Sequence, residues 1–356
     1  MRLAPLSLTP SRVGLRAGLL AALAVSCSPA PPAPPGPAPL RVVVTVPPQA
    51  YLVERIGGER VTTEVMMPSG NSEDTWSPSP RQMGALSRAD LYVLVGHPAF
   101  VVERREIEPA LAAHPGIALV DMSAGMDLAP AGSERGEGDE GDPHVWTAPA
   151  LVRVAAANIE RALADRDPEH AAAYRERLAS FQADLDDLDA EIRRELTGLA
   201  HREFFVAHPA WGHFAAEYGL EQVAIEEEGK EPSARRLVEL IGRARADGIT
   251  TVFAQAGFPE RGARVIAGEV GGRVVVLDPL ARNWLDNTRR TAREIAAALR
   301  APSAAVKHLA QRSSFRDGAV ATQRQNFVPG RPPPCIRSRL IRARPPFPSS
   351  GSSWPS

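Results

Sequence analysis

Four side chains that could bind a metal ion stand in loops where apolar runs of the sequence end. His144 lies in the segment Asp-Pro-His-Val-Trp, and His208 directly follows an apolar run. Asp278 ends another apolar run, and Asp74 lies in a loop after a third. Imidazole nitrogens and carboxylate oxygens together suit Zn²⁺ or Mn²⁺. The sequence therefore predicts one metal site with four protein ligands, Asp74, His144, His208 and Asp278.

The chemistry that such a set supports is the capture of a cation. Two imidazoles and two carboxylates, drawn equally from the two halves of the chain, would close a four-coordinate site where the halves meet. Each residue alone is weak evidence, because a His beside a Pro is often a turn residue and a strand-end Asp is often a helix cap. All four residues follow apolar runs, and this shared position favours one common metal site over four unrelated turn or cap residues.

Other residues compete for these roles. A shift of one residue in the first loop would present Glu73 instead of Asp74. His97 also follows an apolar run and could replace Asp74, although packing against Pro98 is the simpler explanation. Glu226 begins a run of three acids that could act as a general base beside a metal, but such runs are more often solvated. No role is assigned to four other His residues, His114, His170, His201 and His213.

Short apolar runs alternate with helical stretches in both halves of the chain. The predicted strands are 40–46, 61–67, 91–95 and 117–122, then 203–207, 222–225, 251–254 and 273–277. The predicted helices are 48–56, 78–86, 103–113 and 149–164, then 209–218, 233–246, 260–270 and 286–299. This alternation is typical of a parallel sheet with helices on both faces. The predicted fold is α/β, with two lobes that each hold a four-stranded parallel sheet. Such sheets bind ligands at the carboxyl ends of their strands, where the four candidate residues stand.

One long, uninterrupted helix from Asp167 to Gly198 is predicted to join the lobes. Asp167 suits the N-cap, Pro168 suits the first helical position, and Gly198 supplies the stop. Apolar residues recur in steps of four and three along one face, at Tyr174, Leu178, Phe181, Leu185, Leu188 and Ile192. Such a helix would be roughly 45 Å long. We expect a rigid strut with one lobe at each end rather than a coiled coil, because the heptad pattern stops where the helix does.

Both ends of the chain differ from the body. Arg12 and Arg16 precede an apolar stretch, residues 17–25, that is too short to span a membrane and is typical of a signal peptide. The following segment resembles a bacterial lipoprotein cleavage box, which makes Cys27 the expected lipid anchor on a Pro/Ala linker. A secreted protein with an incidental Cys is the alternative. Residues 301–356 are rich in Pro, Ser and Arg without apolar periodicity, so a disordered tail is predicted.

These features divide the chain into five segments. They are a leader and linker (1–39), a first metal-binding lobe (40–165), a linker helix (166–199), a second metal-binding lobe (200–300) and the tail (301–356). The formal net charge of −1 is uneven, since the leader carries +3 and the tail +8, which leaves −12 for the body. An acidic body argues against nucleic acid as a partner and is compatible with a cation.

Three short motifs point to a known family. Pro143–Trp146, His208 and Asp278–Leu280 follow one another along the body. On these residues the chain resembles the zinc/manganese solute-binding proteins of bacterial ABC importers, over about residues 40–300. That family also carries a Pro-His-x-x-x-x-x-Pro element in its first lobe, and its register falls on Glu73-Asp74 up to Pro80. Here Asp74 stands where the family has that His.

The resemblance implies an extracytoplasmic receptor, not an enzyme, that delivers a metal ion to an ABC permease in the membrane. Zinc is the expected cargo and manganese the second choice, and a monomer is expected. One alternative is a manganese or iron(II) receptor of the same family. Another is a metal-dependent periplasmic hydrolase, which would need an open coordination position and a base such as Glu226. A nucleotide-binding enzyme is not expected, because the sequence has neither a Gly-x-Gly-x-x-Gly after a strand nor a P-loop.

Overall fold

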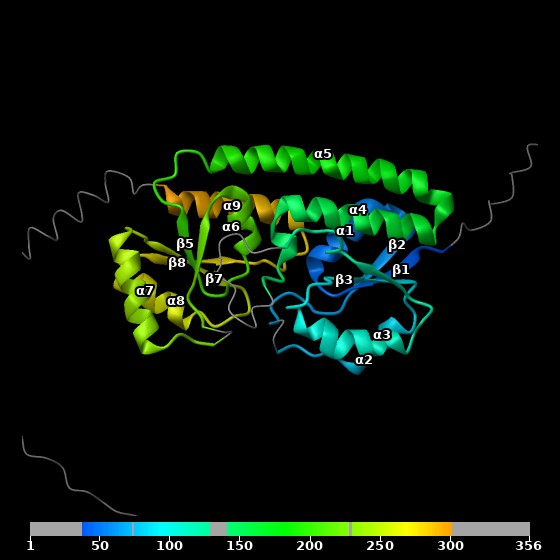
Figure 1. Ribbon diagram of the computed structural model, residues 1–356, viewed down its shortest axis with the longest axis horizontal. Coiled ribbons are helices and arrows are strands. Elements are labelled where there is room, and N and C mark those ends of the chain that lie inside the picture. Colours follow the sequence, from blue (N-terminus) through cyan, green and yellow to red (C-terminus); the bar gives the residue numbers. More distant parts are fainter. Residues whose placement is uncertain (1–37, 73–74, 129–140, 228–229, 301–356) are drawn as a thin grey trace, which may run out of the picture.

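Each half of the chain forms one four-stranded parallel sheet (Figure 1). The computed structural model describes residues 38–72, 75–128, 141–227 and 230–300. The first sheet has the order β2-β1-β3-β4, with β1 (Leu40–Val44), β2 (Val61–Val65), β3 (Leu91–Leu94) and β4 (Ala118–Asp121). The second has the order β6-β5-β7-β8, with β5 (Glu203–Val206), β6 (Glu221–Ala224), β7 (Thr251–Gln255) and β8 (Arg273–Leu277). The predicted fold class is confirmed, and the eight strands lie where the apolar runs placed them.

Helices cover both faces of each sheet. On the first sheet, α1 (Pro47–Gly57) and α4 (Pro149–Arg166) lie on one face, and α2 (Pro80–Leu86) and α3 (Glu108–Ala112) lie on the other (Figure 1). On the second, α6 (Gly212–Tyr218) and α9 (Trp284–Leu299) lie opposite α7 (Ala234–Ala246) and α8 (Arg261–Glu269). Because the sheets are covered on both faces, most side chains of the central strands β1, β3, β5 and β7 are buried, whereas the edge strands stay partly exposed.

The long helix differs from its prediction at both ends. A 3₁₀ turn (Pro168–His170) precedes α5 (Ala171–Glu195), so the helix does not run uninterrupted from Asp167. Asp167 does not cap the helix, because its carboxylate accepts the hydroxyl of Tyr174 at 2.7 Å and lies 2.9 Å from Nδ1 of His170. The 25 residues of α5 span about 37 Å, compared with the roughly 45 Å expected for the predicted helix. Gly198 has the left-handed conformation expected beyond a helix end.

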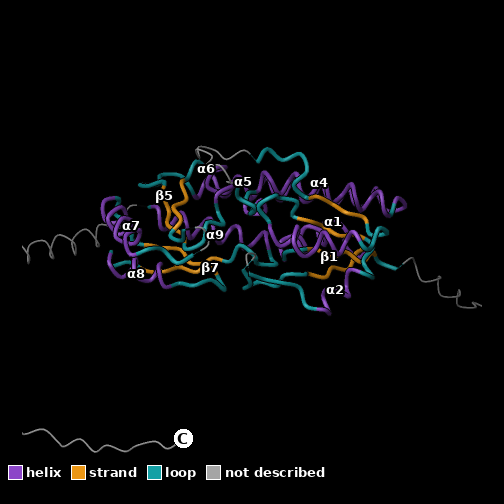
Figure 2. The backbone as a smooth tube through the Cα atoms, turned by 60° about the horizontal axis from the view of Figure 1, so that its bottom comes forward, coloured by secondary structure: helices purple, strands orange, loops and turns teal. Residues whose placement is uncertain are grey.

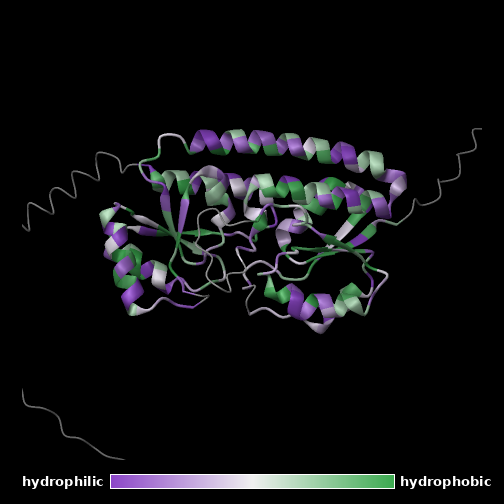
Figure 3. Cartoon of the chain, viewed as in Figure 1, coloured by the Kyte–Doolittle hydropathy of each residue, from purple (hydrophilic) through white to green (hydrophobic). Residues whose placement is uncertain are grey.

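Helix α5 lies along both lobes instead of standing between them (Figures 1 and 2). It packs on α1 and α4 of the first lobe and on α9 of the second. Five of its six predicted apolar residues are buried, and Leu178 is partly buried. Figure 3 accordingly shows hydrophilic and hydrophobic residues side by side along this helix. The predicted apolar stripe is therefore confirmed, and its partners are helices from both lobes.

One continuous apolar core connects the lobes. It extends from the first sheet through Phe181 of α5 and Trp284 of α9 to Phe204 and Phe253 of the second sheet. The rings of Phe181 and Trp284 lie 6.3 Å apart, edge to face. A smaller cluster fills the space under α7 and α8. Such a shared core favours a fixed orientation of the two lobes relative to each other. Within the described residues, no helix combines the length and apolar character needed to cross a bilayer.

The predicted helix at 103–113 contains a wider turn than expected. Residues Glu103–Ile107 form a π-helical turn, and an α-helical turn, α3, follows. Pro109 has no backbone N–H, and its ring would collide with the carbonyl of Arg105 in a regular α-helix. A π-helical turn just before Pro109 accommodates this ring. The sequence prediction did not allow for this effect of Pro109.

Candidate metal centre

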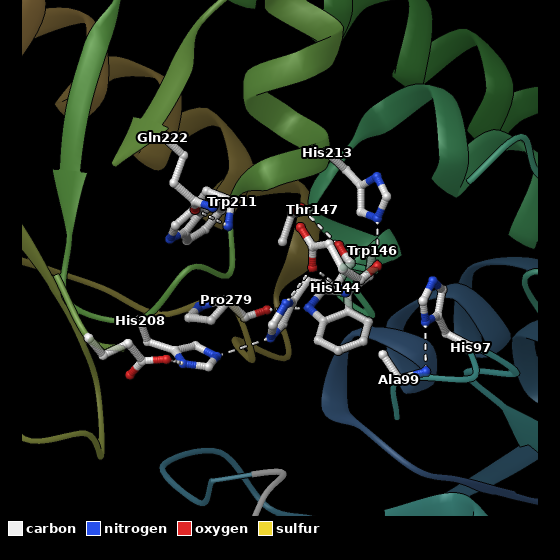
Figure 4. Close-up of polar contacts among 12 residues, drawn as sticks. His97, Ala99, His144, Trp146, Thr147, His208, Trp211, His213, Gln222 and Pro279 are labelled. Carbon is white, nitrogen blue, oxygen red and sulfur yellow. Dashed lines mark hydrogen bonds and ion pairs between the residues drawn. The ribbon is translucent and has the colours of Figure 1, made fainter. Parts of the chain in front are cut away.

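The imidazoles of His144 and His208 meet where the two lobes face each other (Figure 4). Their Nε2 atoms lie 3.3 Å apart, although 64 residues separate them along the chain. Both side chains are buried, with 4% of His144 and 7% of His208 exposed. The sequence placed both residues at one shared site, and the structure brings these two together.

Each imidazole is held from behind by a carboxylate. Nδ1 of His144 lies 2.6 Å from Oδ1 of Asp142, and Nδ1 of His208 lies 2.7 Å from Oε1 of Glu226. A carboxylate accepts hydrogen bonds, so each partner assigns the proton to Nδ1 and leaves the lone pair on Nε2. Metal-binding His residues in proteins usually have such a carboxylate or carbonyl partner. No sequence pattern indicated this role for Asp142, and Glu226 was expected only as a possible base.

This arrangement favours a cation between the two rings. With both protons on Nδ1, two Nε2 lone pairs face each other, and a metal ion bound between them would relieve the repulsion. Two nitrogens at 2.0–2.1 Å from a tetrahedral Zn²⁺ lie about 3.3–3.4 Å apart. The observed 3.3 Å matches that separation. The pair therefore has both the chemistry and the spacing of two zinc ligands.

The parallel strands position the second-lobe part of this site. His208 follows β5, and Glu226 follows the neighbouring strand β6. The ladder continues past the strands, since Ile225 N–H donates to Val206 O at 2.9 Å. The ring of Phe258, after β7, lies 4.6 Å from the His208 ring and covers it. Three adjacent strand ends thus fix one imidazole.

A local turn positions His144. Oδ1 of Asp142 accepts the backbone N–H of His144 at 2.9 Å, which closes an Asx turn across Pro143. Burial opposes ionisation of Asp142, but attraction to and hydrogen bonding with His144 outweigh it and lower the pKa of Asp142. The turn and the charge together hold the ring. The dipeptide Asp-Pro before a candidate His was a sequence signal from which the turn could have been predicted.

Asp278 stands at the same edge of the second sheet, after β8. Its Oδ1 accepts the backbone N–H of Leu280 at 2.9 Å, and burial raises the pKa of Asp278. Among the described residues, no three His, Cys, Asp or Glu side chains are grouped as metal ligands, so Asp278 is not joined to the two imidazoles in this arrangement. Its role as a ligand stays a prediction.

The first-lobe ligand also stays a prediction. Asp74 and Glu73 lie outside the described residues. His97 follows β3 and is buried, and its Nδ1 accepts the backbone N–H of Ala99 at 3.1 Å. A cavity of about 320 Å³ beside His208 is lined by Ser72 and Thr75 from the first lobe and by Glu226 and Phe258 from the second. Ser72 and Thr75, which flank residues 73 and 74, therefore border the cavity beside His208.

His213, which received no role from the sequence, contacts the site. Its Nε2 lies 2.8 Å from the backbone oxygen of Asp142 (Figure 4). Trp146 lies beside His144, with ring centroids 5.4 Å apart, and its indole N–H donates to Pro279 O at 2.9 Å. The contact of His213 with Asp142 and that of Trp146 with Pro279 join segments far apart in sequence, so neither could be derived from local patterns.

Two α/β lobes, connected by a long helix and facing each other across two buried imidazoles, have the architecture of a two-lobed solute-binding receptor. A family model described as zinc-uptake complex component A, periplasmic, matches residues 42–298, and the chain belongs to this family. The high-affinity zinc uptake system protein ZnuA of Bacillus subtilis (strain 168) is 28% identical over 253 residues, which cover 68% of this chain and 78% of that protein.

Two solved structures of ZnuA share the fold. A crystal structure of ZnuA has a TM-score of 0.68 and 38% identity, and covers 73% of this chain and 99% of that one. A 138–173 deletion mutant of ZnuA with zinc bound has a TM-score of 0.69 and 39% identity, and covers 74% of this chain and 99% of that one. The resemblance drawn from the short motifs is therefore confirmed at the level of the family.

Proposed function

We propose that this protein is an extracytoplasmic receptor for zinc, which it carries as cargo to an ABC importer in the membrane. The observation that carries the proposal is the pair of Nε2 atoms 3.3 Å apart, on imidazoles backed by Asp142 and Glu226. The zinc-uptake relatives support the same cargo. Manganese is the second candidate for the cargo. Carboxylate ligands raise the preference of a site for Mn²⁺ relative to an all-nitrogen site, although Zn²⁺ still binds more tightly in absolute terms.

In the proposed centre, His144 and His208 supply nitrogens, and Asp278 and Asp74 supply oxygens. Asp278 shares the carboxyl edge of the second sheet with His208, and a cation would favour its partly buried carboxylate. Ser72 and Thr75, which flank the pair of residues containing Asp74, line the cavity beside His208. Both observations support an oxygen ligand from each lobe.

The site supports a carrier rather than an enzyme. A hydrolase would use a base such as Glu226 on a metal-bound water. Glu226 instead lies 2.7 Å from Nδ1 of His208, where it orients a ligand. Four protein ligands would also leave no coordination position for a substrate water.

The receptor works outside the cytoplasm, as its family does. Its proposed partners are the metal ion and the ABC permease, with no nucleic acid. We place a lipid anchor at Cys27, which lies outside the described residues, and we propose that the receptor acts as a monomer. The linker before β1 would then tether the two lobes to the membrane surface.

Native mass spectrometry of the periplasmic form, with metal analysis, tests the proposal. One Zn²⁺ per chain is expected, and chelator-treated protein should melt several degrees lower and recover with Zn²⁺. Binding to the native state alone adds about 4 kcal/mol of stability at a thousandfold excess over Kd. A melting temperature that no divalent metal changes would reject the receptor.

A further inference from the structure

We propose that Gly212 and His213 of the second lobe are positioning residues that hold Asp142 and thereby orient the imidazole of His144. The inference rests on the proposed function, because it gives His144 the role of a metal ligand. It goes beyond that function by assigning the control of this first-lobe ligand to a helix of the opposite lobe.

The first step is the contact between α6 and the loop before His144. Nε2 of His213 lies 2.8 Å from the backbone oxygen of Asp142, so its N–H donates to that carbonyl. His213 is the second residue of α6, and Asp142 belongs to the first-lobe segment. This hydrogen bond fixes the backbone of the residue whose side chain holds His144.

The second step is the close packing of Gly212 against the Asp142 side chain. A Cβ atom at position 212 would lie 2.5 Å from Oδ2 of Asp142, well inside contact distance. That oxygen is buried and has no hydrogen-bond partner among the described residues. Only a residue without a side chain leaves room for the carboxylate here. Gly212 therefore limits the position of the Asp142 carboxylate, and His213 holds the Asp142 backbone.

The third step is the transfer of this position to the metal ligand. Oδ1 of Asp142 contacts both Nδ1 of His144, at 2.6 Å, and its backbone N–H, at 2.9 Å. A shift of Asp142 consequently turns the imidazole and changes which nitrogen carries the proton. Further bonds tie the same segment to the second lobe, since Ala150 N–H donates to the Glu217 carboxylate at 3.1 Å.

The test compares four variants with the full-length protein. Gly212→Ala introduces the clashing methyl group, and His213→Ala removes the donor, whereas His213→Gln keeps an N–H near the position of Nε2. Gly242→Ala is the matched control, because Gly242 lies in α7 with open space around it. Ala favours a helix more than Gly does, so a loss in Gly212→Ala cannot come from helix propensity.

Two readouts separate this inference from the proposed function. In metal-free protein, ¹⁵N NMR of His144 should report the Nδ1–H tautomer in the parent, His213→Gln and Gly242→Ala, and a mixture in Gly212→Ala and His213→Ala. Zinc affinity should fall about 10–100-fold in those last two variants, the usual cost of losing an outer-shell partner. Unchanged tautomer and affinity in both variants would overturn the inference. A parent protein that binds no divalent metal would instead overturn the proposed function, while the tautomer readout in the metal-free variants would remain valid.

Discussion

The indole N–H of Trp284 donates to the backbone oxygen of Trp146 over 2.6 Å. In the reverse direction, the indole N–H of Trp146 donates to Pro279 O over 2.9 Å. Both indoles are buried, with 1% of Trp146 and 2% of Trp284 exposed. The two bonds join the loop of His144 to the loop of Asp278 and to the first residue of α9, so the packing between the lobes also aligns two candidate ligands.

Replacing Trp284 with Phe should destabilise the protein by about 1–3 kcal/mol, because the buried oxygen of Trp146 loses its donor. Urea unfolding of the metal-free protein measures this change. Trp211→Phe is the control, since within the described ranges the Trp211 indole contacts Phe214 but donates no hydrogen bond. Equal losses in the two variants would show that ring size, and not the hydrogen bond, is responsible.

Replacing His144 or His208 with Ala should weaken zinc binding by more than about 100-fold, beyond the cost of losing an outer-shell partner. Each change removes one of the two nitrogens that lie 3.3 Å apart. Isothermal titration with a competing chelator measures the affinity. His201→Ala, at a position away from the site, should leave it unchanged. If both site variants bind zinc like the parent, the centre lies elsewhere.

The first-lobe ligand can be identified by comparing Ala variants at Asp74, Glu73 and His97. We expect Asp74→Ala to lose affinity and the other two to keep it, and Asp278→Ala to lose it as well. Asp74→His should raise the preference for zinc over manganese, because imidazole is a softer ligand than carboxylate. Competition between the two metals provides the measurement. If Asp74→Ala keeps its metal affinity while Glu73→Ala or His97→Ala loses it, Asp74 is not the first-lobe ligand and the residue with the lost affinity takes its place.

The raised pKa of the Glu103 carboxyl predicts how the free energy of unfolding depends on pH. Its buried carboxylate accepts the N–H groups of Val95 at 2.7 Å and Gly96 at 3.0 Å. Burial nevertheless raises the pKa of Glu103 from 4.5 to about 7. The folded chain therefore holds this proton more tightly than the unfolded chain. The resulting stability is complete below pH 4.5 and is lost as the pH rises through about 7.

The variant Glu103→Gln removes this titration. The stability of the parent relative to the variant should therefore fall between about pH 4.5 and 8, by an amount on the order of 3 kcal/mol. Urea unfolding of metal-free protein across this range measures the difference. A difference that stays flat, or rises with pH, would contradict the assignment of a raised pKa to Glu103.

The sequence was sufficient to predict the strands and the layered fold, because buried parallel strands appear as continuous apolar runs. It was less reliable at helix ends. Pro168 begins a 3₁₀ turn instead of α5, and α9 begins at Trp284, two residues earlier than expected. These ends depend on tertiary contacts, such as those of Asp167 with Tyr174 and of Trp284 with Trp146.

The candidate site was predictable only where strand ends carry its residues. His144 and His208 were identified because both follow strands of a parallel sheet. The role of Glu226 depends on β5 and β6 being neighbours, which the order of strands along the chain did not specify. His213 reaches Asp142 across the lobes, and no local pattern indicates such a contact.

X-ray absorption at the zinc edge tests the central claim most directly, using protein loaded with one equivalent of Zn²⁺. We expect a four-coordinate ion with two imidazoles at about 2.0–2.1 Å and oxygen ligands in the remaining positions. Each of the variants His144→Ala and His208→Ala should lose one imidazole from the spectrum. A zinc spectrum with no imidazole scattering, or one unchanged in both variants, would contradict the assignment of His144 and His208 as the ligands.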